Sequence, residues 1–241
     1  MEHTEAQEKL NSFYAEKIQA LRLAECFTPA EQKILSAPFL IQVTEQYFHA
    51  PVRILFVGQE TRGWLEKLGQ TLQREDSVTP LLERYSKQMK IPKWKSALLK
   101  KYRLLEQELG GGVRGSIVWS NLNKMDVDRG KRKTRNSRGY STHLDAFSEK
   151  LFRYEVEVLK PDVMIFGCSY THDAVIKRYF PLYETNPGGE PYSLWKFTVG
   201  NTQCYRTWHP STIRHRGKKS IKSYYQQIIE DVKTKFPGIY K

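Results

Sequence analysis

The sequence predicts an α/β fold built on a short, mainly parallel sheet. Three apolar runs, at residues 52–57, 116–120 and 162–167, have the length and composition of strands covered on both faces. An amphipathic helical pattern over residues 143–160 separates the second run from the third. The first two runs each deliver polar side chains at the carboxyl end, where open α/β sheets bind ligands.

Composition indicates a polyanionic partner. The 241 residues include 39 Lys and Arg against 26 Asp and Glu, a net charge of +13, and 12% of them are aromatic. Nucleic acid is the leading partner, and an anionic membrane surface is the alternative. No apolar run approaches the roughly 18 residues of a spanning helix, so we expect no membrane insertion.

The N-terminus and the cysteines suggest the compartment. The N-terminus is polar and acidic, which is not the pattern of a secretory signal. Cys26, Cys168 and Cys204 are too few and too scattered for a disulfide framework, a zinc knuckle or an iron-sulfur cluster. We therefore expect a protein of the reducing cytoplasm, with no metal and no cofactor.

Helices are predicted before the first strand. Apolar residues recur at helical spacing over residues 4–24, and Thr28-Pro29 has the form of a helix start with proline at its first position. We expect residues 1–49 to form a helical extension that packs on a core domain spanning residues 50–241.

The first apolar run stops at Gly58, a residue type that lets the backbone approach a ligand closely. Gln59, Glu60, Thr61 and Arg62 follow at the strand's carboxyl end. A carboxylate in such a crevice can orient a water molecule. The alternative is that Glu60 is a solvated acid in a loop.

Residues of about 65–112 are predicted to form a helical insertion that is broken at Pro80 and Pro92. Lysines gather late in this segment, so the helix face is predicted either to contact a polyanion or only to be solvated. The glycines at 110–112 resemble a phosphate loop weakly, because no Gly-Lys-Ser or Gly-Lys-Thr follows them.

The second strand repeats the pattern of the first, because Asn121 and Asn123 follow its apolar run. Amide and carboxylate side chains at the ends of several strands are what a composite site needs.

Residues 128–139 form a strongly basic segment in which six of twelve residues are Lys or Arg. As an exposed loop it is predicted to bind the phosphates of the nucleic-acid backbone, and the alternative is that it has no specific role. The residues expected to contact phosphate are Arg129, Lys131, Arg132, Lys133 and Arg135.

The last third of the chain adds a helix, a hairpin and a final helix. A helix is expected to open at Ser169 after the third strand, and Gly200-Asn201 joins two short strands as a hairpin. The last strand leads into His209-Pro210-Ser211 and a basic segment, followed by a helix with one apolar face.

Three signatures at strand ends, in this order, resemble the uracil-DNA glycosylase superfamily: Gly58-Gln59-Glu60, Asn121 and His209-Pro210-Ser211. The similarity runs from about residue 52 to 235. Each motif alone is weak, but their order on the right elements is fairly specific. The resemblance implies a three-layer α/β/α sandwich with a short, mainly parallel central sheet, N-terminal helices and a helical insertion.

The resemblance also implies chemistry. Glu60 takes the place of the family's aspartate, which orients water and stabilises the cationic sugar, and neutral His209 donates to the pyrimidine O2. The alternative for His209 is a structural histidine beside proline. Asn121, with Gln59 of the first motif, is expected to bind the flipped base, and Asn123 is a less favoured candidate.

The segment after His209 is expected to contact DNA. Relatives place an apolar wedge there, and Ile213 occupies that place in this sequence unless it packs locally. The neighbours expected to contact DNA are Ser211, Arg214, His215, Arg216 and Lys218.

One departure from the family concerns substrate choice. The uracil enzymes carry proline and tyrosine after the first motif, whereas this chain has Thr61 and Arg62. Without the aromatic wall, Arg62 is predicted either to bind a polar substituent at C5 of the base or to bind a phosphate. The expected substrate is uracil or a larger C5-modified cytosine, such as that of some phage genomes.

The sequence thus predicts a monofunctional DNA glycosylase that leaves an abasic site. We expect a monomer that is cytoplasmic and lies on the nucleoid when bound to DNA, in repair or in defence against foreign DNA. The alternatives are a conventional uracil repair glycosylase and a non-catalytic DNA-binding module of the same fold. A metal-dependent nuclease that uses Glu60, Asp126 and Asp162 is less favoured, because Asp162 precedes its strand.

Overall fold

The computed structural model describes residues 2–92, 96–130, 137–213, 215 and 217–240. Internal contacts divide the chain into two compact units, each assembled from three segments. The first unit contains Met1–Gln42, Gln59–Ile91 and Ser120–Leu159, and the second contains Val43–Gly58, Pro92–Trp119 and Lys160–Lys241. The N-terminal helix packs on later helices of the first unit, and the predicted division between residues 49 and 50 stays a prediction.

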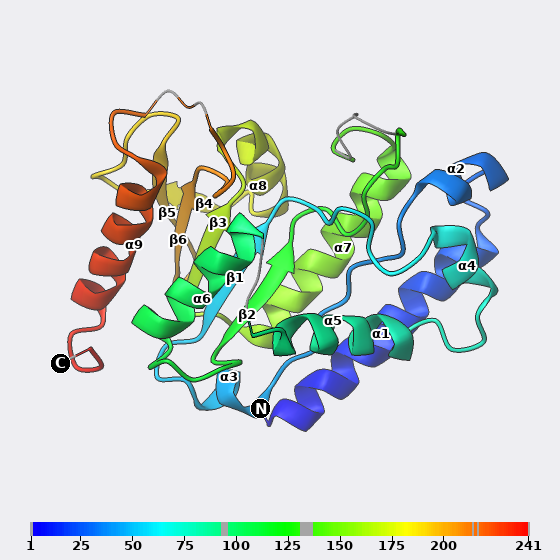
Figure 1. Cartoon of the computed structure of the whole chain (residues 1–241), viewed down its shortest axis with the longest axis horizontal. Coiled ribbons are helices and arrows are strands. Elements are labelled where there is room, and N and C mark those ends of the chain that lie inside the picture. Colours follow the sequence, from blue (N-terminus) through cyan, green and yellow to red (C-terminus); the bar gives the residue numbers. More distant parts are fainter. Residues whose placement is uncertain (1, 93–95, 131–136, 214, 216, 241) are drawn as a thin grey trace. The chain divides into compact units, whose positions relative to one another are not determined.

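The regular structure of the first unit is mainly helical over its described residues. Its helices are α1 (His3–Leu23), α2 (Pro29–Ile34), α4 (Leu68–Gln73), α5 (Thr79–Lys90) and α7 (Thr142–Leu159). The apolar positions of α1 are buried, and α1 packs on α7 and α4 (Figure 1). The predicted start of α2 is confirmed: Thr28 and Glu31 form a reciprocal capping box with Pro29 at the first position.

A buried ion pair joins the loop after the second strand to α7 within this unit. Lys124 and Glu155 are both completely buried, with Nζ and Oε2 at 2.6 Å. Tyr14 donates its hydroxyl to the other carboxylate oxygen at 2.8 Å, and Ser120 bridges the two charges. Burial lowers the pKa of Lys124, so the nearby carboxylate is needed to keep the ammonium charged.

The second unit contains most of a six-stranded sheet, counted over the described residues. Its strands are β1 (Ile54–Gly58), β2 (Ile117–Asn121), β3 (Val163–Gly167), β4 (Tyr183–Thr185), β5 (Leu194–Val199) and β6 (Thr202–Thr207). The order is β2-β1-β3-β6-β5-β4. The last two residues of β2, Ser120 and Asn121, belong to the first unit. The three predicted strands and the hairpin are confirmed.

The sheet is mixed, and the predicted α/β class is confirmed. β1 pairs with β3 and β3 with β6 in parallel, whereas β4 with β5 and β5 with β6 are antiparallel. The sequence analysis missed β4, because this edge strand is only three residues long and none of its residues is buried. The parallel strands β1, β3 and β6 end at Gly58, Gly167 and Thr207, and these carboxyl ends lie on the same side of the sheet.

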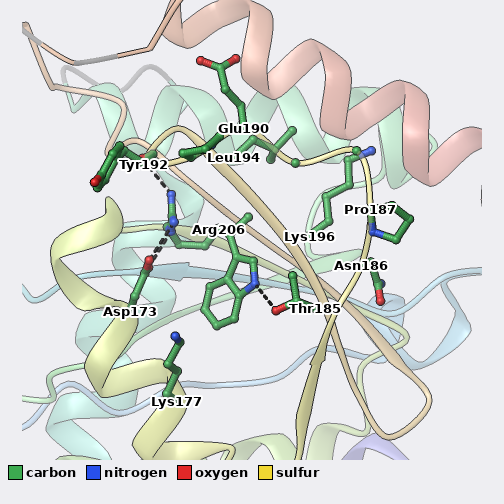
Figure 2. Close-up of a pocket in the computed structure, with 14 residues that line it drawn as sticks. Asp173, Lys177, Thr185, Asn186, Pro187, Glu190, Tyr192, Leu194, Lys196 and Arg206 are labelled. Carbon is green, nitrogen blue, oxygen red and sulfur yellow. Dashed lines mark hydrogen bonds and ion pairs between the residues drawn. The ribbon is translucent and has the colours of Figure 1, made fainter.

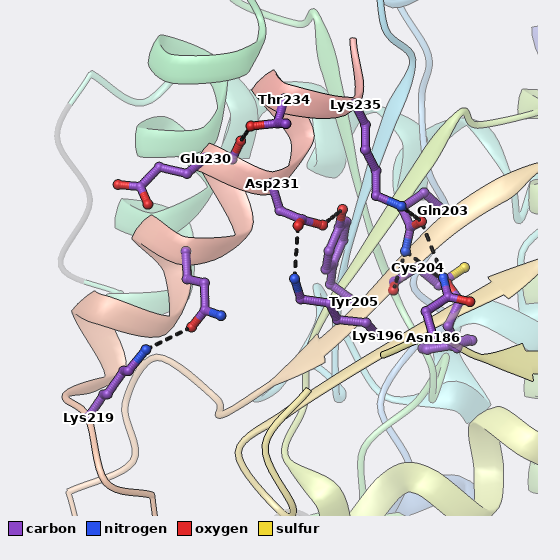
Figure 3. Close-up of polar contacts among 12 residues, drawn as sticks. Asn186, Lys196, Gln203, Cys204, Tyr205, Lys219, Glu230, Asp231, Thr234 and Lys235 are labelled. Atoms are coloured by element: carbon purple, nitrogen blue, oxygen red, sulfur yellow. Dashed lines mark hydrogen bonds and ion pairs between the residues drawn. The ribbon is translucent and has the colours of Figure 1, made fainter. Parts of the chain in front are cut away.

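Helices cover both faces of this sheet. The second unit contains α3 (Glu45–His49), α6 (Ala97–Leu109), the short η1 (Tyr170–His172), α8 (Asp173–Tyr179) and α9 (Ile221–Lys235). Asp231 of α9 accepts from Lys196 and Tyr205 on one face (Figure 3). Arg206 instead pairs with Asp173 of α8, and successive strand residues face opposite sides. The second unit therefore has a helix, sheet, helix arrangement.

In the part of the chain that the structure describes, no helix combines the length and the apolar character needed to cross a membrane.

Candidate active site

Glu60 is a partly buried carboxylate in the first unit, two residues after β1 ends. The amide Nδ2 of Asn123 donates to its Oε2 at 3.1 Å. The backbone N–H of Asn123 also donates to the carbonyl of Gln59 at 2.8 Å. Two hydrogen bonds from one residue thus tie the loop after β2 to the loop that carries Glu60.

The surroundings of Glu60 favour its protonated form more than water does. Burial is the largest cause that raises the pKa of this carboxyl, and the negative charge of Asp126 raises it further. The amide of Asn123, the backbone N–H of Ser137 and the charge of Arg138 act in the opposite direction. Glu60 is therefore a desolvated carboxylate whose charge depends on a few identifiable groups, which is typical of catalytic acids and bases.

Asp126 shapes the loop that follows Glu60. It is completely buried, and its Oδ2 accepts from the hydroxyl of Thr61 and the backbone N–H of Gly63, both at 2.7 Å. Gly63 has φ 80°, a conformation that glycine adopts without strain. Arg62, between these two anchors, has an exposed side chain. The carboxylate thus fixes the turn, and the guanidinium is left at the surface.

The structure distinguishes the two asparagines after the second apolar run. Asn121 is the last residue of β2 and is completely buried, whereas Asn123 lies in the loop beyond it and contacts Glu60. The base-binding role predicted for Asn121 stays a prediction. Asn123, which the sequence analysis placed second, is the residue that touches the carboxylate. The sequence could not show this, because it does not mark where β2 ends.

His209 lies in the second unit, two residues after β6 ends. Its backbone N–H donates to the hydroxyl of Ser169 at 3.2 Å. Ser169 follows β3, and its own N–H donates to the carbonyl of Thr207 at 2.9 Å. Ser169 has φ 69°, which is uncommon for a residue with a side chain and is held here by both hydrogen bonds. The sequence analysis missed this supporting role of Ser169.

Hydrogen bonds to the imidazole fix its tautomer. The backbone N–H of Ser211 points to Nδ1 of His209 at 3.2 Å, and the Ser211 hydroxyl lies 2.7 Å from the same atom. Because a backbone N–H can only donate, Nδ1 must be the acceptor. In its neutral form the ring therefore carries its proton on Nε2, which makes that atom a hydrogen-bond donor.

The segment after His209 contains one strongly exposed apolar residue. Ile213 is 93% exposed, so it does not pack locally, as the alternative for it required. Lys218 is exposed as well. His215 is half-buried, with its ring centroid 5.3 Å from that of Trp208, so it supports the segment from inside. Arg214 and Arg216 lie outside the described residues.

The basic segment at 128–139 is described only at its ends. Arg129 is exposed, and its guanidinium lies 6.0 Å from the ring centroid of Tyr140. Asp128 beside it pairs with Lys67 at 2.6 Å. Four residues with predicted phosphate contacts lie outside the described part of the chain: Lys131, Arg132, Lys133 and Arg135.

Asp162, a residue of the nuclease alternative, has a structural partner within the second unit. Its carboxylate accepts from the backbone N–H of Arg53 at 2.8 Å and from the guanidinium of the same residue at 3.2 Å. This pairing joins the beginnings of β1 and β3, at the opposite end of these strands from Gly58 and Gly167. Asp162 therefore stabilises the pairing of β1 with β3 and does not contribute to a site at the carboxyl ends of the strands.

Comparison with known proteins gives no independent assignment. No protein-family model matches the chain, and no curated protein matches it.

Proposed function

We propose that the protein is a monofunctional DNA glycosylase of the uracil-DNA glycosylase-like fold. It flips a modified pyrimidine out of DNA, hydrolyses the N-glycosidic bond and leaves an abasic site. The observation that carries the proposal is the desolvated Glu60 carboxylate held by the Asn123 amide after β1. The donor character of Nε2 in His209, after the parallel strand β6, supports it.

The two side chains match the charges that develop in this reaction. Breaking the bond between sugar and base leaves positive charge on the sugar and negative charge on the base. Ionised Glu60 orients the attacking water and stabilises the sugar cation, while His209 donates its Nε2 proton in a hydrogen bond to the pyrimidine O2. The basic surface of the chain, with its net charge of +13, supplies the attraction to DNA.

The substrate class follows from Arg62. Its exposed guanidinium lies between Thr61 and Gly63, the two residues that Asp126 holds by hydrogen bonds. The uracil enzymes that the sequence resembles have a tyrosine at this position, which excludes bases with a bulky C5 substituent. We propose that it accepts a polar C5 substituent, so that the substrate is uracil or a larger C5-modified cytosine. If the wild-type protein removes only uracil, it is a conventional uracil repair enzyme, and Arg62 is left to bind a phosphate.

One experiment tests the activity. Purified protein is incubated with DNAs that contain uracil, a thymine mismatch, hydroxymethylcytosine or glucosylated hydroxymethylcytosine, and then treated with alkali, which cleaves DNA at abasic sites. We expect alkali-dependent breaks in at least one modified DNA and none before alkali. Tight DNA binding without breaks in any of them identifies the non-catalytic module instead.

A further inference from the structure

A cavity of about 390 Å³ opens in the second unit, between α8 and the antiparallel strands β4 and β5. Its walls are α8, the loop at residues 186–192, and side chains of β5 and β6. This volume is at the lower end of the range of about 300 to 1,000 Å³ found for ligand sites. The cavity therefore has room for one small group.

One wall is an aromatic ring that is fixed before any ligand arrives. The indole of Trp195 stacks on Phe197 with centroids 4.0 Å apart, and its Nε1 donates to the hydroxyl of Thr185 at 3.1 Å. Trp195 is nevertheless only half-buried. Tyr192 adds a second ring that is 51% exposed. Rigid, exposed rings lose little conformational entropy when another ring stacks on them.

The charges around the cavity leave a positive rim. Arg206 is buried and forms a two-point pair with Asp173, at 2.6 and 2.8 Å, which neutralises both groups (Figure 2). Lys177 is exposed, and its ammonium lies 5.5 Å from the ring centroid of Trp195. Lys196 pairs with Asp231 of α9, and Glu190 points away from Lys177. Lys177 therefore favours an anionic group attached to the stacked ring.

A line of aromatic rings connects this cavity with the end of β6. The centroid of Tyr192 lies 5.1 Å from that of Tyr170, which lies 5.5 Å from that of Trp208. Trp208 immediately precedes His209. The main chain of Tyr192 is held as well, because Arg206 donates to its carbonyl at 2.9 Å. Trp208 itself is only 5% exposed and supports Tyr170 from inside, so the rings on this line that a ligand strand can contact are Tyr170 and Tyr192.

We propose that this cavity binds a nucleobase of the DNA strand near the nucleotide that His209 contacts. The base stacks on Trp195 and Tyr192, and Lys177 contacts its phosphate. Single-stranded nucleic acids are held by this combination of aromatic rings and cations, with little dependence on sequence. The inference rests on the proposed function only for the path of the DNA strand past His209. The cavity and the charges around it do not depend on that function.

The test measures binding of unmodified single-stranded DNA. A short fluorescein-labelled oligodeoxythymidylate is titrated with wild-type protein and with Tyr192→Ala, Trp195→Ala and Lys177→Glu. Removing one stacking side chain should raise the Kd roughly five- to a hundredfold. Arg178→Glu is the matched control, because Arg178 is the next exposed cation on α8 and lies outside the cavity lining. It should change the Kd much less than Lys177→Glu.

A second measurement guards against variants that fail to fold. Oligonucleotides carrying 5-iododeoxyuridine are crosslinked by light to wild-type protein, and the modified peptides are identified by mass spectrometry. We expect crosslinks at Tyr192 or Trp195. Crosslinks confined to other segments, or equal affinity of Lys177→Glu and Arg178→Glu, overturn the inference. Because the DNA is unmodified, these results do not depend on glycosylase activity, and the abasic-site assay judges that activity separately.

Discussion

At the scale of single residues, the proposed chemistry depends on Glu60 and His209. Glu60→Gln should lower turnover by orders of magnitude with little change in DNA affinity, because the carboxylate acts on the cationic transition state. His209→Ala should behave similarly. The two side chains are proposed to serve one reaction, so the double variant should be little slower than the worse single variant. Single-turnover kinetics and DNA titration measure this, and effects that simply multiply contradict a role of both side chains in one chemical step.

The charge on Glu60 makes a second prediction at this scale. Burial raises the pKa of this carboxyl, and only its ionised form assists, so activity should fall as pH drops through a pKa above that of an ordinary glutamate. Asn123→Ala removes a donor that favours the ionised form, which should move this acid limb to higher pH. Asp126→Asn removes a negative charge and should move it to lower pH. If the profiles of kcat against pH coincide for the wild type, Asn123→Ala and Asp126→Asn, Glu60 is not the group whose ionisation controls activity.

Arg62 determines the substrate in the third prediction. If its guanidinium holds a polar C5 substituent, Arg62→Ala should reduce activity on the bulky base roughly ten- to a hundredfold, since removing a charged hydrogen-bonding partner typically costs about 1.5 to 3 kcal/mol. Activity on uracil should change much less, and Arg62→Tyr should exclude the bulky base. Parallel decreases on both substrates would identify Arg62 as a phosphate-binding residue.

At the scale of elements, the basic segment at 128–139 is predicted to bind phosphates. Reversing the charge of Arg129 and of the cations from 131 to 138 should weaken binding to all sequences alike. The slope of log affinity against log salt should flatten by about 0.9 for each phosphate that the variant no longer neutralises. Charge reversal at exposed Lys150 and Arg153 of α7 is the control. An unchanged slope in the loop variant means that the segment does not bind DNA.

At the scale of the whole molecule, stability should depend on the buried pair of Lys124 and Glu155. Glu155→Ala leaves the ammonium uncompensated, so the free energy of unfolding should fall by about 3 to 5 kcal/mol. Glu157→Ala, at an exposed position of α7, is the control and should have little effect. Lys124→Met combined with Glu155→Leu should recover much of the stability, because no charge remains buried. Urea denaturation measures each value.

The sequence by itself determined the elements. Apolar runs that must be buried predicted β1, β2 and β3, and helical spacing with Thr28-Pro29 predicted α1 and α2, because these patterns act over a few neighbouring residues. It also predicted which loops carry polar side chains, including Glu60 and His209. The short, exposed β4 was missed because it has no such pattern.

Only the tertiary structure decided which side chains meet. The contact of Asn123 with Glu60 joins residues 63 positions apart, and the pair of Lys124 and Glu155 joins residues 31 positions apart. The hydrogen bond from the backbone of His209 to Ser169 joins residues 40 positions apart, and the cavity at Trp195 depends on how α8 lies against the strands. Such contacts depend on where the chain turns after each strand, and local sequence patterns do not encode these distances.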